Sequence, residues 1–311
     1  MIVLRLRRSD TPAPAAWSAF RVAGHEIVTD VPLAALAAFA GPLPADVPAL
    51  PEPAPPKAAA TLADETYRGP AWLCGSTREV VCSVTTCGYE LTVAGVGEFS
   101  VAADGSCVDC TASALDPADP ALAEAVLGPA LTLALALRGT FCLHASAVLS
   151  TAGVLLFLGP SGSGKSTVAA GIAGGDPRFT CLTDDVTPLA PSADGVEVRP
   201  RFPQLKLPDE RQPASNAPHA VALRAAYLLG VPDAASSRAV SVEALDPARG
   251  LAALVRHTVA VRLFSRDLLA AYLEALAAAP ALPVRVLRYP RRHEVLPEVA
   301  AALAADVADH Q

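Results

Sequence analysis

The sequence predicts an α/β protein in which a smaller β-rich N-terminal module precedes a larger domain of alternating strands and helices. Three observations carry this prediction. Short β-rich segments separated by glycine turns fill residues 70–115. A strand, a glycine-rich loop and a helix follow one another around residues 154–173, and strands and helices then alternate to the end of the chain. We therefore assign residues 1–118 to the N-terminal module and residues 119–311 to the second domain.

The N-terminal module begins with a predicted strand and an irregular segment within residues 1–40. Residues 41–57 carry seven prolines and no hydrophobic periodicity, which predicts a linker or a long surface loop. Strand-like segments at 80–84, 89–93 and 98–101, separated by glycine-containing turns at regular spacing, predict a small antiparallel sheet. Because no catalytic constellation lies in it, we expect a docking or substrate-recognition module.

Cys107 and Cys110 form a C-x-x-C pair within this module. A zinc site needs a second pair of cysteine or histidine ligands at suitable spacing, and the neighbouring cysteines do not supply one. The pattern therefore favours two half-buried strand or turn cysteines.

An apolar segment at 121–138 opens the second domain after the helix start signal Asp119-Pro120. Because Glu124 and Gly128-Pro129 interrupt it, we expect a buried helix rather than a membrane span. Residues 141–149 are then a predicted strand that forms a hairpin with the strand at 154–158.

His144 lies on the first strand of this hairpin, and the period of two predicts that it shares a face with Cys142 and Ser146. A single strand histidine is most often a structural residue with satisfied hydrogen bonds. The nearby loop raises the alternative that His144 faces a nucleotide or an acceptor.

The loop from Gly159 to Thr167 matches G-x-x-x-x-G-K-[ST], the phosphate-binding P-loop. Its glycines let backbone N–H groups turn toward phosphate oxygens at the N-terminus of the following helix. Lys165 can reach the β- and γ-phosphates, and the hydroxyl of Ser166 can ligate Mg²⁺. The predicted cofactors are ATP and Mg²⁺, with ATP not distinguished from GTP by the sequence. The predicted nucleotide-binding residues are Gly159, Ser161, Gly162, Ser163, Gly164, Lys165, Ser166 and Thr167.

Asp184 and Asp185 follow a predicted third strand at 179–183. Carboxylates at the carboxyl end of a strand beside the P-loop strand can divide two tasks, accepting the proton of an acceptor hydroxyl and holding the metal. The alternative without a catalytic role is a solvent-exposed Asp-Asp turn.

The basic residues later in the chain are weaker indicators of a phosphate-binding role. Arg201 and Lys206 could neutralise phosphate charge or lie on a surface strand. Arg256, His257, Arg262 and Arg266 form a basic group in the sequence, for which solvated faces and ion pairs are the more ordinary interpretation.

The overall charge and the cysteine content indicate which classes of binding partner are unexpected for this protein. A net charge of −7 and a pI near 5.4 argue against nucleic acid. Seven cysteines without disulfide-like spacing and no secretory signal predict a cytoplasmic protein with no membrane partner. The oligomeric state is left open, a homo-oligomer included.

Together, three segments resemble the catalytic domain of HPr kinase/phosphorylase: Leu143 to Val148, the P-loop, and Thr183 to Val186. The tail Leu287-Arg288-Tyr289-Pro290 is similar to HPr-kinase-related proteins of biosynthetic gene clusters. The resemblance spans roughly residues 120–311. It implies a P-loop kinase domain of HPr kinase/PEP carboxykinase type that uses ATP and Mg²⁺ to phosphorylate serine.

The resemblance also implies roles for individual residues. His144 matches the family's histidine before the P-loop, Asp184 its general base, and Lys165 and Ser166 its P-loop lysine and serine. Asp185 matches the next aspartate, which with Ser166 would hold the metal.

This chain departs from the bifunctional enzymes at Ala145, where they usually have glycine, and at Pro160, where they have aspartate. Their later Glu-x-Arg-Gly stretch has no match either. These departures argue against phosphorylase activity and against HPr as the substrate. The expected partner is a peptide or protein with an acceptor serine, such as a lasso precursor peptide. The alternatives are a kinase for a small hydroxylated molecule such as free serine, and a nucleotide sensor without catalysis.

Overall fold

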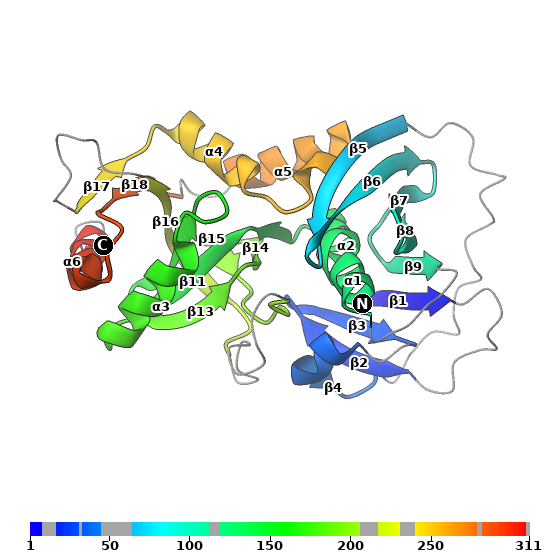
Figure 1. Cartoon of the computed structure of the whole chain (residues 1–311), viewed down its shortest axis with the longest axis horizontal. Coiled ribbons are helices and arrows are strands. Elements are labelled where there is room, and N and C mark those ends of the chain that lie inside the picture. The colour runs from blue at the N-terminus through cyan, green and yellow to red at the C-terminus, as the bar shows by residue number, and fades with distance from the viewer. Residues whose placement is uncertain are drawn as a thin grey trace. The chain divides into compact units, whose positions relative to one another are not determined.

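The computed structural model describes residues 1–7, 17–30, 33–44, 64–111, 119–205, 217–230, 240–278 and 282–308. Most of the proline-rich segment, from residue 45 onward, and the candidate phosphate ligand Lys206 lie outside these ranges. The prediction of a mixed α/β protein is confirmed, because two large mixed sheets are present (Figure 1).

Contacts divide the chain into two units. Unit 1 contains Met1–Thr140 and Ala260–Tyr272, and unit 2 contains Phe141–Val259 and Leu273–Gln311. This division groups the helical segment after residue 119 with the N-terminal sheet, whereas the sequence prediction assigned it to the second domain.

Unit 1 is built on a nine-stranded sheet with the order β4-β2-β3-β1-β9-β8-β7-β6-β5. β1 pairs in parallel with β3 and β9, and the other neighbours are antiparallel. The predicted strands at 80–84, 89–93 and 98–101 are confirmed as parts of β6, β7 and β8. The strands are β1 (Ile2–Arg7), β2 (Ser18–Val22), β3 (His25–Thr29), β4 (Ala40–Gly41), β5 (Asp64–Leu73), β6 (Ser76–Thr85), β7 (Gly88–Val93), β8 (Gly97–Ala102) and β9 (Cys107–Thr111).

The apolar helical segment of unit 1 packs against β8 and β9, and Figure 1 shows the strands curving around it. It consists of α1 (Pro120–Ala125), a π-helical turn (Val126–Ala130) and α2 (Leu131–Leu137). The predicted single helix is therefore interrupted, because Pro129 lacks an N–H and Gly128 leaves helical geometry. By length and a mean hydropathy of 1.7 the segment could span a membrane, yet 67% of it is buried, as in a core helix.

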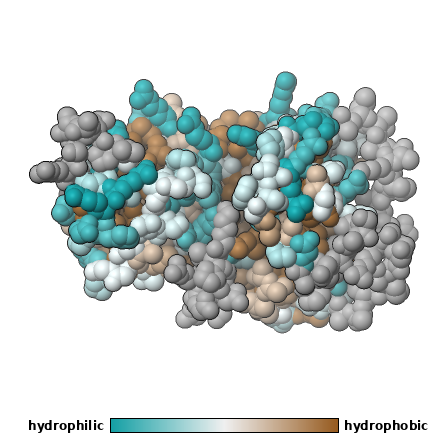
Figure 2. All heavy atoms as spheres, in the orientation of Figure 1, coloured by the Kyte–Doolittle hydropathy of each residue, from teal (hydrophilic) through white to brown (hydrophobic). Residues whose placement is uncertain are grey.

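Two 3₁₀ helices (Ala34–Phe39 and Val261–Leu263) complete unit 1, together with the start of α5 (Arg266–Ala278). In Figure 2, hydrophilic side chains gather over β5 and β6. Arg68 there pairs with Glu65 and Glu79.

Unit 2 contains the second sheet, with the order β10-β14-β15-β16-β12-β11-β13 and with β18 and β17 added beside β16. β12, β16 and β18 are mutually parallel, while β11 runs antiparallel to both β12 and β13. The strands are β10 (Phe141–Leu143), β11 (Ala145–Ser150), β12 (Gly153–Leu158), β13 (Thr180–Asp184), β14 (Thr187–Ser192), β15 (Gly195–Val198), β16 (Val221–Gly230), β17 (Ser241–Ala244) and β18 (Val284–Arg288).

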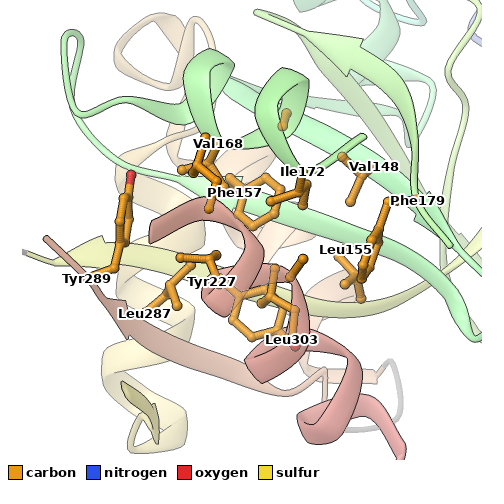
Figure 3. Packing of buried hydrophobic residues seen from close by; sticks show 14 of the residues in the cluster. Val148, Leu155, Phe157, Val168, Ile172, Phe179, Tyr227, Leu287, Tyr289 and Leu303 are labelled. Carbon is orange, nitrogen blue, oxygen red and sulfur yellow. The ribbon is translucent and has the colours of Figure 1, made fainter. Parts of the chain in front are cut away.

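Helices cover both faces of this second sheet. The period-two alternation of β12 sends Leu155 and Phe157 toward α3 (Lys165–Gly175) and α6 (Leu296–Ala308), as Figure 3 shows for the core on that face. Val154, Leu156 and Leu158 join the core on the other face, where Leu254 of α4 (Pro247–Arg256) packs. A short 3₁₀ helix (His293–Val295) precedes α6.

Candidate active site

The P-loop joins the end of β12 to the start of α3 at one edge of the sheet of unit 2. Gly162 and Gly164 have φ angles of +76° and +92°, a left-handed conformation in which any side chain is strained. The loop closes on itself, since Ser163 N donates to the carbonyl of Pro160 at 3.1 Å. These two glycines explain why this sequence folds as a tight cradle rather than as an extended connection.

Lys165 lies inside this cradle with 6% of its surface exposed. Its Nζ donates to the carbonyl oxygens of Gly159 at 2.8 Å and Pro160 at 3.2 Å. The Ser163 hydroxyl is buried and has no hydrogen-bond partner among the described residues. A β-carbon added to Gly162 would meet no atom within 4 Å, so open space faces the loop there. A cationic, donor-lined cradle of this kind fits the oxygens of a nucleotide phosphate chain.

Asp184 is the last residue of β13, at the same end of the sheet as the P-loop. The sequence predicted that this strand would lie directly beside the P-loop strand, and that prediction is wrong. β11 lies between them: Ser146 stands opposite Phe157 of β12 on one side and opposite Asp184 on the other. Two inter-strand spacings place the backbone of Asp184 about 10 Å from the strand that leads into the P-loop. The reason is that β13 pairs with the outer side of the hairpin rather than with β12.

Ser146 holds the first carboxylate. Its hydroxyl is fully buried and donates to Asp184 Oδ1 at 2.5 Å. Sequence reasoning placed Ser146 on the face of His144 but gave it no role. A polar residue in an otherwise apolar strand was the available signal.

His144 holds the second carboxylate. Its Nδ1 lies 3.2 Å from Asp185 Oδ1 and 3.1 Å from the carbonyl oxygen of Asp185. Because both partners are acceptors, Nδ1 carries the ring proton. The predicted continuous strand at 141–149 is wrong at this point. It breaks at His144, where β10 leaves to pair with β14 and β11 continues beside β12.

The backbone of Asp185 has a φ of +124°, which is costly for a residue with a side chain. Its N–H donates to the carbonyl of Ala145 at 3.1 Å, which holds the turn in place. Fully buried Gln204 fixes the next residue by accepting from Val186 N at 3.1 Å and donating to Val186 O at 2.9 Å. Thr187 adds a bond from its hydroxyl to Ala145 O at 3.2 Å. Several hydrogen bonds therefore fix the conformation of the Asp-Asp turn. The sequence analysis did not identify Gln204 and Thr187 as residues that hold this turn.

His257 follows the last residue of α4, and its carbonyl accepts from His144 N at 2.7 Å. Burial, then the positive charge of Lys165, and then His144 and Arg256 lower its pKa from 6.5 to about 4. Lys165 and His144 therefore both lie close enough to His257 to lower its pKa. Of the predicted basic group, Arg256 and His257 belong to unit 2, whereas Arg262 and Arg266 belong to unit 1.

A pocket of about 200 Å³ adjoins the P-loop. The residues 289–293 that line it follow β18, which lies two strands from β12, next to β16. A β-carbon on Gly164 would come within 3.4 Å of the Tyr289 hydroxyl, and Figure 3 shows that hydroxyl pointing out of the core. The lining residues are Gly164, Thr167, Tyr289, Arg291, Arg292, His293 and Leu296.

The two predicted metal ligands differ in their surroundings. Ser166 is exposed in the first turn of α3, while the Asp185 carboxylate is held by His144. Within the described ranges, no group of three or more His, Cys, Asp and Glu side chains is arranged to hold a metal ion by itself. The candidate phosphate ligand Arg201 has a buried Nε without a hydrogen-bond partner among the described residues.

Cys107 and Cys110 lie on β9, three residues apart, so their side chains point to opposite faces of that sheet. Burial raises the pKa of the Cys110 thiol to about 12. One metal ion could not take both as ligands without a change in this strand.

Comparison with known proteins gives a distant structural similarity. No protein-family model matches the sequence, and no curated protein matches it. Among solved structures, the Hpr(Ser) kinase/phosphatase from Coxiella burnetii is 12% identical, with a TM-score of 0.32. The match covers 54% of this chain and 97% of that one, so the similarity extends over about half of the present protein.

Proposed function

We propose that unit 2 is an ATP- and Mg²⁺-dependent kinase that transfers the γ-phosphoryl group to a serine hydroxyl of a peptide or protein. The observation that carries the proposal is the arrangement at one sheet edge. The P-loop with its buried lysine follows β12, and an oriented pair of carboxylates lies two strands away, at the end of β13 and directly after it. A separation of about 10 Å leaves room between them for a γ-phosphoryl group and an acceptor hydroxyl.

In this proposal Asp184 is the general base. Ser146 holds one carboxylate oxygen, and the other is left to accept the proton of the acceptor serine. As the serine oxygen forms its bond to the γ-phosphorus, the bond from that phosphorus to the bridging oxygen breaks and ADP leaves. The proton of the serine hydroxyl ends on Asp184.

Lys165 and the loop N–H groups stabilise the negative charge that spreads over the phosphoryl oxygens during transfer. In the structure the lysine is held by two loop carbonyls, which keep its ammonium within the cradle. Ser166 and Asp185 would hold Mg²⁺, and His144 would orient Asp185 for that task. When bound, the ion would neutralise charge on the β- and γ-phosphates.

The pocket beside Gly164 and Thr167 suits the nucleoside end of ATP. It lies on the opposite side of the P-loop strand from Asp184, because β16 and β18 lie on one side of β12 and β11 and β13 on the other. Tyr289 offers an aromatic surface, and Arg291, Arg292 and His293 offer donors.

The test incubates the full-length protein with ATP, Mg²⁺ and the peptides and proteins encoded beside its gene, followed by mass spectrometry. A single phosphoryl group on serine, absent with Asp184→Asn although ATP still binds, is the expected result. Asp176→Asn is the matched control, because Asp176 pairs with Arg178 at the exposed far end of α3.

Undiminished transfer by Asp184→Asn would overturn the assignment of the base. Transfer to free serine with no peptide present would replace the acceptor by a small molecule. Tight ATP binding with no transfer to any of these acceptors would replace the kinase by a nucleotide sensor.

A further inference from the structure

His257 lies directly opposite His144 in a short antiparallel pairing within unit 2. His144 N donates to the carbonyl of His257 at 2.7 Å, and Val259 N donates to the carbonyl of Cys142 at 2.8 Å. Residues that stand opposite each other in an antiparallel pair have their side chains on one face, with β-carbons about 4.5–5.5 Å apart. The imidazole rings of His144 and His257 are therefore neighbours. The phosphoryl transfer proposed above uses the first ring and leaves the second without a task.

This histidine pair lies beside the start of the P-loop. In the pairing of β11 with β12, Ala145 stands opposite Leu158, the last residue before Gly159. One inter-strand spacing, about 5 Å, thus separates the chain next to His144 from the strand end that leads into the loop. The carbonyl of Gly159 accepts from Lys165 Nζ at 2.8 Å, so the ammonium group lies at the same strand end.

Electrostatics agree with this placement. After burial, the positive charge of Lys165 is the next cause of the lowered pKa of His257, and His144 follows it. The His257 ring is therefore near both the P-loop lysine and the histidine that holds the Asp185 carboxylate.

The His257 ring is available to a ligand. It is half-buried, it makes no hydrogen bond within the part of the chain that the structure describes, and both of its nitrogens keep accessible surface. An imidazole carries at least one N–H in either protonation state, so a donor is present at any pH. Polar groups in half-buried positions at a binding site commonly find their partner in the ligand or in ordered water.

The position of the ring indicates which part of a nucleotide it would meet. The group to be transferred would lie in the gap of about 10 Å between the P-loop and the carboxylates. Lys165 borders this gap on the P-loop side, and Asp185 borders it on the other. A donor close to both Lys165 and His144 is near the γ-phosphoryl group rather than the α-phosphate or the base. Hydrogen bonds to such anionic oxygens are among the stronger ones in proteins.

We propose that His257 contacts the nucleotide: its imidazole N–H donates to a γ-phosphoryl oxygen of ATP, and this bond lets the site distinguish a triphosphate from a diphosphate. The inference rests on the nucleotide site of the proposed function. It depends neither on phosphoryl transfer nor on the identity of the acceptor.

The test is calorimetry on the full-length protein with Mg²⁺ and two probes. One is ADP, and the other is the ATP analogue in which a methylene group replaces the bridging oxygen between the β- and γ-phosphorus atoms, so that transfer cannot occur. His257→Ala should weaken binding of the analogue by about tenfold or more and binding of ADP by about twofold or less. In NMR spectra of the wild-type protein, the ring nitrogen signals of His257 should shift with the analogue and stay in place with ADP.

Two conservative variants separate a hydrogen bond from a packing effect. His257→Asn and His257→Gln place an amide N–H near the positions of Nδ1 and Nε2, so one of them should restore affinity for the analogue and identify the donating nitrogen. His219→Ala is the matched control, because His219 is an exposed histidine before β16 in the same unit.

Equal losses for the two nucleotides, loss without rescue by either amide, or unmoved His257 signals would overturn the inference and leave the proposed kinase intact. If His257→Ala fails to fold, the amide variants and the wild-type signals decide. Because the analogue cannot react, a protein that shows the expected selectivity without any kinase activity would support the contact and contradict the proposed function. A wild-type protein that binds neither nucleotide would overturn both.

Discussion

The Ser146 hydroxyl donates to Asp184 Oδ1 at 2.5 Å, from the middle strand of three to the end of the outer one. Ser146→Ala removes this donor and leaves a carboxylate oxygen unpaired, which costs about 1–3 kcal/mol. If Asp184 is the base, as proposed above, we expect phosphoryl transfer to slow by about tenfold or more with little change in the KM for ATP, because Ser146 would position the base and not the nucleotide.

Steady-state kinetics with a phosphorylated-peptide assay would measure this split. Ser150→Ala is the matched control on the same strand, since Ser150 donates to Gly153 in the hairpin turn at the other end. A Ser146→Ala enzyme that loses ATP affinity and keeps its maximal rate would show that Ser146 serves the nucleotide instead.

Lys165→Met should raise the pKa of His257 above its present value of about 4. The positive charge of Lys165 is the second cause of the lowered pKa, after burial. Titration of the His257 ring protons by NMR measures the change. Arg178→Met removes an exposed charge from the far end of α3 and should leave the pKa unchanged. An unmoved pKa in Lys165→Met would show that the two charges are not coupled.

Stability should fall as the pH is lowered from about 6.5 toward 4. In that window the unfolded chain protonates His257 at its ordinary pKa of 6.5, whereas the folded protein keeps it neutral down to about 4. The unfolded state then binds more protons, so acid favours unfolding, while above pH 6.5 this residue adds no pH dependence. Urea denaturation at a series of pH values, with His257→Gln for comparison, measures its share; an equally steep decline in the variant would assign the effect to other groups.

The pocket beside the P-loop should favour the nucleoside end of ATP. We expect the double variant Arg291→Ala/Arg292→Ala to weaken ATP binding by about tenfold, while inorganic triphosphate loses about threefold or less. Calorimetry with both ligands measures the difference. Arg199→Ala is the control, since Arg199 pairs with Glu197 away from the pocket. Equal losses for both ligands would mean that the arginines contact phosphate alone.

Asp306 holds two buried partners in unit 2: Tyr227 Oη donates to it at 2.7 Å, and Arg285 Nε lies 2.8 Å from the same oxygen. Burial, and then the Asp306 carboxylate, raise the pKa of Tyr227. Asp306→Ala leaves the buried Arg285 guanidinium without its carboxylate partner, so the free energy of unfolding should fall by about 3–5 kcal/mol.

Urea denaturation checks this value against Asp176→Ala, which breaks an exposed ion pair and should cost about 1 kcal/mol or less. The double variant Arg285→Met/Asp306→Leu should recover part of the loss, because it removes both charges. A loss as small as that of Asp176→Ala would show that the pair contributes little.

Local chemistry made the P-loop predictable from sequence. Gly162 and Gly164 occupy backbone conformations that other residues avoid, and Lys165 is one of three lysines in the chain. The hairpin β11–β12 could also be predicted, since a short apolar run at 154–158 and the turn at Gly153 indicate it. The Asp119-Pro120 signal marked the start of α1, where the carboxylate caps Ala121 N.

Features that depend on pairing between strands far apart in the sequence could not be predicted. Nothing local tells β13 to pair with β11 rather than with β12, so the distance from Asp184 to the P-loop was not predictable. The strand break at His144 depends in the same way on β10 pairing with β14, more than forty residues later in the chain. The role of Gln204 was not predictable either, because it hydrogen-bonds Val186, which lies eighteen residues earlier in the chain.

The division of α5 between the two units has a consequence for dissecting this protein. The chain passes from one unit to the other after residues 140, 259 and 272, the last time in the middle of this helix. A fragment that begins at residue 119 would carry Ala260–Tyr272 and the apolar segment Pro120–Leu137 without the sheet that buries them. Activity should therefore be sought in the intact chain, because a fragment that begins at residue 119 would expose these core residues and aggregate.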